Sequence, residues 1–167
     1  MQVQAIELQK RIDRFQELCR TRGVRLTPQR LEVFRAVAAS SAHPDAEMVL
    51  RGVQKRFPNV SLDTVYRTLW MLNDLGLVGT LGRRDSVRFD AESRPHHHYV
   101  CRRCQRVWDL MEHNPTAFAP PGEATKLGTI QEVRLEVQGV CTDCEKTDKA
   151  KRPPSKAART KTTRTPS

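Results

Sequence analysis

Two Cys-x-x-Cys pairs constrain this chain more than any other feature. Cys101 and Cys104 form the first pair, Cys141 and Cys144 form the second, and each pair follows a segment expected to be a strand. Four thiolates match the tetrahedral coordination of Zn²⁺, and four protein ligands leave no position for a reacting water. The spacing therefore predicts a structural zinc site, with disulfides or free thiols as the alternative. The fifth cysteine, Cys19, falls in an apolar helical stripe and is expected to pack in a core.

The distribution of charge separates a mildly basic body from a strongly basic tail. The chain has 167 residues and a net charge of +10, and residues 146–167 carry eight basic side chains against the single acid Asp148. Residues 147–167 are expected to be disordered and to bind polyanions without sequence preference. No apolar run approaches the ~20 residues that a membrane helix requires. The first ten residues lack the apolar region of a secretory signal, so a cytoplasmic protein without a membrane partner is expected.

Helical periodicity dominates the first half of the chain. Capping residues such as Thr27 and Ser61 precede two of the apolar-periodic stretches, and Gly23 and Gly76 follow two of them. Helices are expected at residues 5–20, 28–40, 46–56 and 61–75, followed by strands at 77–81 and 86–89 with a hairpin at 82–85. Helices followed by a hairpin are typical of a winged helix-turn-helix domain. Met48 and Trp70 are expected among the buried side chains of the third and fourth helices.

A second unit is expected to follow a short hinge. Strands are expected at residues 99–101, 107–109 and 131–140, and residues 115–128 predict only a weak short helix. The fold class is therefore α+β, with an N-terminal winged helix-turn-helix domain and a C-terminal α/β unit that holds the structural zinc. The expected boundaries are 1–90 for the DNA-binding domain, 91–94 for the hinge, 95–146 for the metal-binding C-terminal unit and 147–167 for the tail.

A second metal site is indicated by three consecutive histidines before Cys101. A strand through this stretch places His96 and His98 on one face, because side chains alternate along a strand. Asp90 ends the second strand of the hairpin, Asp109 ends a later strand, and His43 is proposed as a third imidazole. A mixed nitrogen and oxygen set of this kind suits Fe²⁺, Mn²⁺ or Zn²⁺.

Seven motifs, in this order, make the chain resemble the ferric uptake regulator family. They lie at residues 23–30, 42–44, 63–67, 75–78, 88–90, 96–104 and 139–144, within a match that covers about residues 10–145. The resemblance implies a homodimeric repressor that binds a double-stranded DNA operator, with an AT-rich inverted repeat expected. It also implies that the C-terminal unit is an α/β dimerisation domain. Peroxide-responsive members look most similar, since iron-sensing members more often carry Glu at the position of Asp109.

The resemblance also implies the roles of the metal ligands. The regulatory ion, Fe²⁺ or Mn²⁺, would be held by three His and two Asp, which are His43, Asp90, His96, His98 and Asp109 in this chain. With iron bound, peroxide would lead to oxidation of His43 or His96, loss of the metal and release of DNA. Such sensing is stoichiometric, so the protein is not expected to be an enzyme.

DNA contacts are expected mainly from the fourth helix. Tyr66 and Arg67 lie near its start, where recognition helices meet base edges, and can contact a thymine methyl and a guanine or phosphate. Arg25 is expected near a phosphate or the minor groove, and Arg83 and Arg84 near the DNA backbone.

Three other functions are alternatives to a peroxide sensor. An iron- or zinc-responsive uptake repressor would keep the same fold and metal sites. A metallohydrolase would require a substrate pocket and a general base, for which the sequence offers no candidate beyond the ligands. A general nucleic-acid-binding protein would depend on the basic tail alone.

Overall fold

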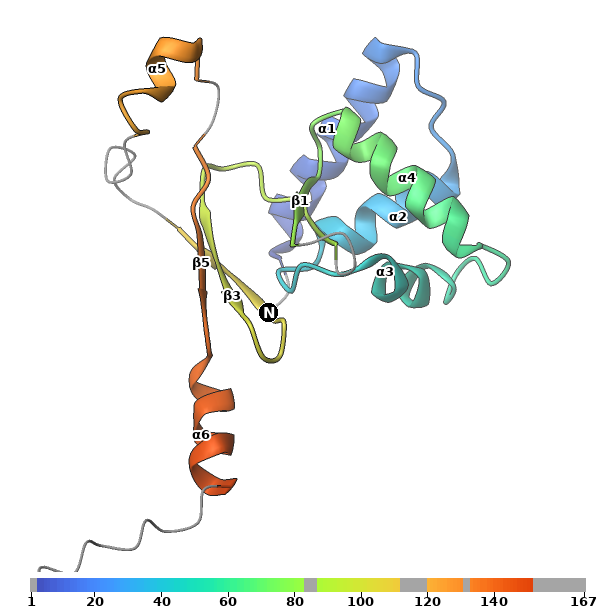
Figure 1. The fold of residues 1–167 in the computed structure, drawn as a ribbon. Helices are drawn as coiled ribbons and strands as arrows, with labels where there is room; N and C mark the ends of the chain where they lie inside the picture. Colours follow the sequence, from blue (N-terminus) through green and yellow to red (C-terminus); the bar gives the residue numbers. More distant parts are fainter. Residues whose placement is uncertain (1–2, 83–86, 112–119, 131–132, 152–167) are drawn as a thin grey trace, which may run out of the picture.

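The computed structural model describes residues 3–82, 87–111, 120–130 and 133–151 of the chain. Figure 1 shows two lobes that lie side by side, a helical lobe and a more extended lobe built around a small sheet. The helical lobe contains the first four helices and a two-stranded hairpin. The mixed α and β fold class expected from the sequence is confirmed.

Three helices of the first lobe begin directly after a capping side chain, while α2 and α3 end two and three residues before the expected positions. Thr27, Asp45 and Ser61 each accept a hydrogen bond from the backbone amide three residues later, which satisfies one free amide of the following helix. Gly23 ends the first helix with a φ of 64°, a conformation that glycine adopts without strain. The elements are α1 (Ala5–Arg22), α2 (Pro28–Ala38), α3 (Ala46–Val53), α4 (Leu62–Asp74), β1 (Gly79–Leu81) and β2 (Arg88–Asp90).

One hydrophobic core supports the helical lobe. Its buried members run from Ile12 to Ala91, and the rings of Phe15 and Phe34 pack at its centre with centroids 4.8 Å apart. Cys19 is buried in this core, as its position in the helical stripe predicts. The described part of the second lobe contributes no residue to this cluster.

Two side chains expected in the core are exposed instead. Met48 is 39% exposed and Trp70 is 45% exposed, so both predictions were wrong. On α4 the buried face is formed by Val65, Leu69 and Leu72, and helical geometry turns Trp70 away from it. The exposed ring still contacts the helical lobe through its edge, because it lies 6.1 Å from the ring of Phe89 at a steep angle.

The second lobe is a three-stranded sheet with the order β4-β3-β5. Strand β3 (His97–Cys101) pairs antiparallel with β4 (Val107–Leu110) and parallel with β5 (Glu136–Gly139). The register places His98 opposite Asp109, which brings a histidine and a carboxylate together across two strands. The strand expected at 131–140 is shorter in the structure, and residues 131–132 lie outside the described chain. A short helix, α5 (Ala124–Leu127), precedes it.

The chain after the last cysteines is helical where the sequence predicted disorder. Helix α6 spans Thr142–Lys151, so the disorder expected from residue 147 was wrong for 147–151. Asp143 and Glu145 lie in its first turn, where acidic side chains favour a helix through its dipole. The Thr147 hydroxyl donates a hydrogen bond to the Asp143 carbonyl, which adds to this turn.

A buried ion pair joins the helical lobe to the segment between the lobes. Arg11 on α1 donates a hydrogen bond of 2.8 Å to Glu92, and each side chain is only 9% exposed. Glu92 also pairs with Arg94, so one carboxylate binds two guanidinium groups. Among the described residues, no helix is long and apolar enough to cross a membrane.

Candidate metal centre

The four paired cysteines meet at the base of the sheet. Cys101 ends β3, Cys104 follows in a tight turn, and Cys141 and Cys144 lie at the start of α6. Their sulfur atoms all lie within 4.8 Å of one another, with Cys101 to Cys144 at 4.0 Å and Cys104 to Cys141 at 3.8 Å. All four are free thiols, and these separations far exceed the ~2.05 Å of a disulfide bond. The arrangement fits a tetrahedral metal and not the disulfide alternative.

Backbone amides around Cys101 favour its ionised form. The amides of Cys104 and Cys141 donate hydrogen bonds to the Cys101 sulfur at 3.5 and 3.3 Å. These bonds lower the pKa of the Cys101 thiol to about 6, and the bond from Cys104 contributes most. Burial acts in the opposite direction and raises this pKa. A thiolate at neutral pH is the form that binds zinc.

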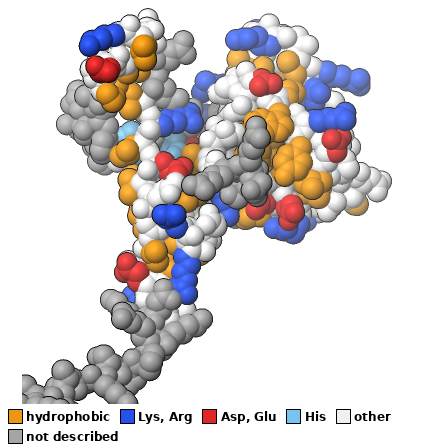
Figure 2. Space-filling model, in the orientation of Figure 1, with side chains coloured by type: hydrophobic (Ala, Val, Ile, Leu, Met, Phe, Trp, Pro, Cys, Tyr) orange, Lys and Arg blue, Asp and Glu red, His pale blue; other side chains and the backbone are white. Residues whose placement is uncertain are grey.

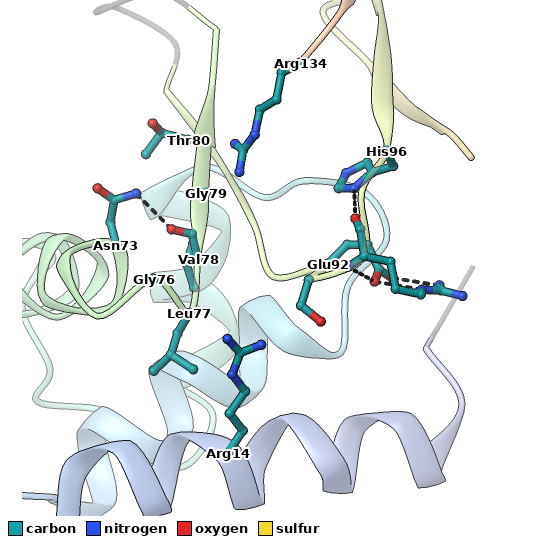
Figure 3. Close-up of a pocket in the computed structure, with 12 residues that line it drawn as sticks. Arg14, Asn73, Gly76, Leu77, Val78, Gly79, Thr80, Glu92, His96 and Arg134 are labelled. Carbon is teal, nitrogen blue, oxygen red and sulfur yellow. Dashed lines mark hydrogen bonds and ion pairs between the residues drawn. The ribbon is translucent and has the colours of Figure 1, made fainter. Parts of the chain in front are cut away.

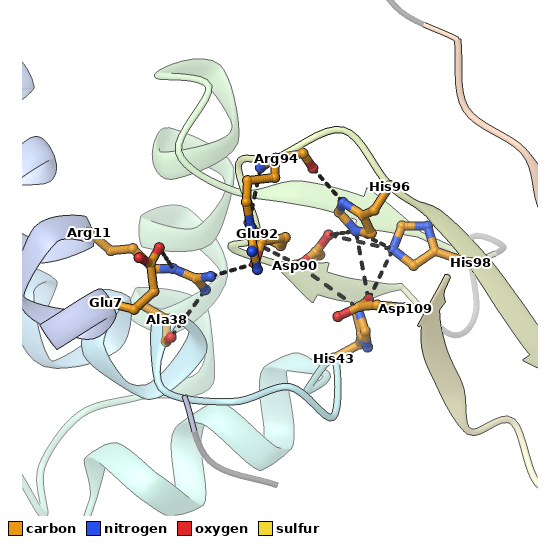
Figure 4. A network of polar contacts seen from close by, with 10 residues as sticks. All are labelled: Glu7, Arg11, Ala38, His43, Asp90, Glu92, Arg94, His96, His98 and Asp109. Atoms are coloured by element: carbon orange, nitrogen blue, oxygen red, sulfur yellow. Dashed lines mark hydrogen bonds and ion pairs between the residues drawn. The ribbon is translucent and has the colours of Figure 1, made fainter. Parts of the chain in front are cut away.

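A second cluster gathers three histidines and two aspartates from both lobes (Figure 4). His43 lies in the turn between α2 and α3, and Asp90 ends β2 in the helical lobe. His96 precedes β3, His98 lies in β3 and Asp109 lies in β4. The alternation expected from the sequence places His96 and His98 on one side of the chain, and both are buried.

The ligand atoms of four of these five side chains converge, and Asp90 lies outside the convergent group. His43, His96, His98 and Asp109 each offer a ligand atom within 4.8 Å of the other three. Oδ1 of Asp109 lies 2.7 Å from Nε2 of His43, 3.7 Å from Nε2 of His96 and 3.6 Å from Nε2 of His98. Asp90 approaches the imidazoles from another side, with Oδ2 at 2.9 Å from His96 and 3.5 Å from His98.

The donor set fits a divalent cation. Asp109 Oδ1 is buried without a hydrogen-bond partner despite its closeness to His43, and such orphaned groups are costly. Nε2 of His96 and Nε2 of His98 face each other at 2.9 Å, which directs two ring nitrogens at the same space. Nδ1 of His96 lies 2.7 Å from the Arg94 carbonyl. When the neutral ring donates its proton from Nδ1 to this carbonyl, Nε2 carries the lone pair that can bind a metal.

The charges inside the cluster are strongly coupled. Burial alone would raise the pKa of Asp90, but hydrogen bonds from His96 and His98 outweigh it and hold this pKa well below its usual range. The hydrogen bond to Asp90 raises the pKa of His96 to about 9, so this ring carries a proton at neutral pH. A cation that binds Nε2 must displace that proton.

Two cavities border the cluster on different sides. One, of about 450 Å³, lies between the lobes and is lined by Arg14, Arg134 and His96 among others (Figure 3). The other, of about 720 Å³, is lined by Asp109, Arg106 and Trp108 among others. His96 and Asp109 are thus residues of the cluster that also line a cavity.

Comparison with known proteins decides the family of this chain. A model of the ferric uptake regulator family matches residues 21–138. The chain belongs to the ferric uptake regulator family. The peroxide-responsive repressor PerR of Staphylococcus epidermidis is 32% identical over 127 residues, which cover 75% of this chain and 85% of that protein.

Solved structures of the ferric uptake regulator family share the fold. The regulator of Helicobacter pylori superposes with a TM-score of 0.64 at 19% identity, covering 87% of this chain and 97% of that one. A zinc-bound manganese uptake regulator gives a TM-score of 0.54 at 28% identity, covering 75% of this chain and 97% of that one. The winged-helix and α/β architecture expected from the sequence is thereby confirmed.

Three of the five residues expected to contact DNA are described by the structure, and none of these three belongs to either metal cluster. Tyr66 is 41% exposed on α4, and the neighbouring Arg67 forms an ion pair with Asp63 at 3.0 Å. Arg25 is exposed in the segment between α1 and α2, where its carbonyl accepts a hydrogen bond from Arg30. Arg83 and Arg84 lie outside the described residues. The DNA-binding roles of these five residues stay predictions.

Sequence reasoning missed the ion pair that supports the second cluster. Nothing in the spacing of Arg11 and Glu92 links them, since they are 81 residues apart. The backbone amide of Glu92 donates to Oδ1 of Asp90 at 2.8 Å, so the same residue also orients a candidate ligand. The position of Glu92 two residues after Asp90 in the hinge is the only sequence signal that could have drawn attention to it.

Proposed function

We propose that this member of the ferric uptake regulator family is a metal-dependent transcriptional repressor that senses hydrogen peroxide. The observation that carries the proposal is the position of His43, whose Nε2 lies 2.7 Å from Asp109 in the other lobe. An ion bound by both residues would stabilise the arrangement in which the lobes lie close. By linkage, the metal then populates the conformation that binds it best.

Both lobes would contribute ligands to this ion. His43 and Asp90 would hold it from the helical lobe, and His96, His98 and Asp109 from the sheet lobe. The Arg94 carbonyl fixes the ring of His96, and the Glu92 amide fixes the carboxylate of Asp90. Such supporting bonds orient ligands before the metal arrives. The separate group of four cysteines would hold a structural Zn²⁺.

DNA binding would depend on two copies of this arrangement. In a homodimer with closed lobes, the two α4 helices would enter successive major grooves about 34 Å apart. Exposed apolar side chains on the sheet lobe support dimerisation through that lobe, among them Trp108, Leu110, Val137 and Val140. Metal and operator would strengthen each other's binding reciprocally. An inverted-repeat operator would match the symmetry of such a dimer.

Peroxide sensing would use ferrous iron held by the histidines and aspartates of this cluster. When bound, the iron would activate hydrogen peroxide, so that one oxygen atom is inserted into a C–H bond of the ring of His43 or His96 and the other leaves as water. The ring supplies the two electrons of this oxidation. His96 and Asp109 each line a cavity, which supports access for a small neutral oxidant. An oxidised imidazole would bind the metal weakly, so the metal would be lost and the two lobes would separate. The reaction consumes the sensor and is not enzymatic turnover.

The test compares the Fe²⁺ form with the Mn²⁺ form of the full chain. We expect peroxide to release operator DNA from the Fe²⁺ form and to add 16 Da to a peptide that contains His43 or His96. The Mn²⁺ form should keep its DNA and its unmodified histidines. Gel-shift titration and peptide mass spectrometry provide the two measurements.

Each other result has a defined meaning. If peroxide leaves both forms on DNA while metal removal releases them, the protein is a metal-uptake repressor of the same family. If chelation leaves DNA affinity unchanged, the bridging role of the His43 cluster is wrong. A variant that ends at Lys146 separates the contribution of the basic tail, which should affect mainly salt-sensitive, non-specific affinity.

A further inference from the structure

The outward face of α4 is aromatic rather than cationic. Asp63, Tyr66, Arg67 and Trp70 are spaced three and four residues apart and therefore share one side of the helix. Tyr66 is 41% exposed and Trp70 is 45% exposed, and both point away from the core. Figure 2 shows exposed hydrophobic side chains among charged ones on the helical lobe. Two large aromatic side chains therefore lie on the part of the candidate recognition helix that faces solvent.

The arginine on this face lies beside a carboxylate of the same helix. Arg67 is paired with Asp63 at 3.0 Å across one helical turn, although both side chains are largely exposed. The indole of Trp70 is held by an edge contact with Phe89, a fully buried residue of β2. A ring held in place loses little conformational freedom when it binds. Trp70 is thus an exposed apolar surface already oriented on the candidate recognition helix.

We infer that Trp70 recognises the C5 methyl group of a thymine in the major groove. The inference rests on the proposed function, which places α4 in that groove. Of the four bases only thymine presents an apolar group there, and apolar side chains are the ones that contact it. Two neighbouring aromatic side chains on this face suit a site that presents a thymine methyl group. Trp70 would act together with Tyr66, one turn earlier on the same face.

The test uses replacement of thymine by uracil, which removes only the methyl group. Duplexes that bind the Mn²⁺-loaded full-length protein are first selected from a random library. Each thymine of a selected duplex is then replaced in turn by uracil. We expect at least one replacement to weaken wild-type binding by roughly fivefold. Trp70→Ala should weaken binding to the thymine duplex by a similar factor. The variant should then bind the thymine duplex and the duplex with uracil at that position with equal affinity.

Two variants control for folding and for apolar exposure in general. Trp70→Phe keeps an aromatic ring against Phe89 and should retain most of the sensitivity to uracil. Ile6→Ala removes an exposed apolar side chain from α1 and should bind every duplex as the wild type does. Tyr66→Ala should abolish the effect of the uracil replacement at a different thymine position. Thermal melting of each variant confirms that the helical lobe remains folded.

The outcomes separate this inference from the proposed function. If no duplex is enriched in a Mn²⁺-dependent manner, the proposed function is wrong and the role of Trp70 falls with it. If duplexes are enriched but Trp70→Ala keeps the wild-type response to every uracil, only the inference about Trp70 is overturned. The same holds if Trp70→Ala weakens all duplexes equally, because that pattern describes a contact with the DNA backbone.

Discussion

At the scale of single residues, His43 and Asp109 are the side chains that connect the two lobes. His43 has a φ of 49°, an uncommon conformation for a residue with a side chain, although histidine is among those that tolerate it best. The conformation turns the imidazole inward, where the side chain is 1% exposed. Such local strain persists where the surrounding structure requires it, which is frequent at functional sites.

The orphaned oxygen of Asp109 provides a test of the second metal centre. Asp109→Asn keeps the size of the side chain and removes its charge, so the convergent set loses an anionic ligand. We expect the dissociation constant for Mn²⁺ to rise by at least tenfold, measured by calorimetric titration. Asp13→Asn, an exposed change on α1, is the matched control and should leave the affinity unaltered. Equal affinities in the two variants would exclude Asp109 as a ligand.

At the scale of elements, α1 is attached to the interlobe segment by a buried ion pair. Arg11 donates to Glu92, to Glu7 and to the Ala38 carbonyl, which is the end of α2. The neighbouring Arg94 lowers the pKa of Glu92 to about 2, with Arg11 contributing. Glu92 is therefore ionised at neutral pH, and the chain between β2 and β3 is held against the first helix.

Removal of the charge on Glu92 should destabilise the helical lobe. Glu92→Gln leaves Arg11 buried without its main partner, and breaking a buried pair in this way costs about 3 kcal/mol of unfolding free energy. Glu17→Gln on α1, the helix that carries Arg11, removes an exposed ion pair with Arg20. This control should leave the unfolding free energy unchanged. Urea denaturation followed by circular dichroism compares the two. Similar midpoints for both variants would mean that the Arg11 pair adds nothing to stability.

At the scale of the whole molecule, the two lobes differ in what stabilises them. The helical lobe has an extended core, whereas the described sheet lobe places few large side chains out of solvent and joins its strands to α6 through the cysteine cluster. A small unit with little core commonly depends on a metal for its stability. The lobes therefore should unfold separately when the zinc is lost.

Loss of a single cysteine ligand should expose this difference. We expect Cys144→Ser to retain no zinc after dialysis against a chelator and to lose hydrogen-exchange protection in β3 and β5. The helical lobe should keep its protection, because its core lies between Ile12 and Ala91. Cys19→Ala, which alters a buried thiol outside the cluster, should retain one zinc per subunit. Loss of protection throughout the chain of Cys144→Ser would contradict independent lobes.

Local patterns in the sequence determined most of the elements and both groups of candidate ligands. Caps, apolar spacing and strand alternation depend on neighbouring residues, so α1 to α4, the cysteine pairs and the shared face of His96 and His98 are all readable from the chain. The two aspartates were indicated by their positions at strand ends, whereas the choice of His43 depended on resemblance to a family, because spacing alone does not bring distant residues together.

Only the tertiary structure decided which side chains meet across the lobes and which face solvent. The pairing of Arg11 with Glu92 and the approach of His43 to Asp109 join segments 81 and 66 positions apart in the chain, and no local rule encodes either. Trp70 is exposed because packing against α2 and α3 selects one face of α4, which composition cannot reveal. Helix α6 forms beside the cysteine cluster, in a segment whose composition alone favours disorder.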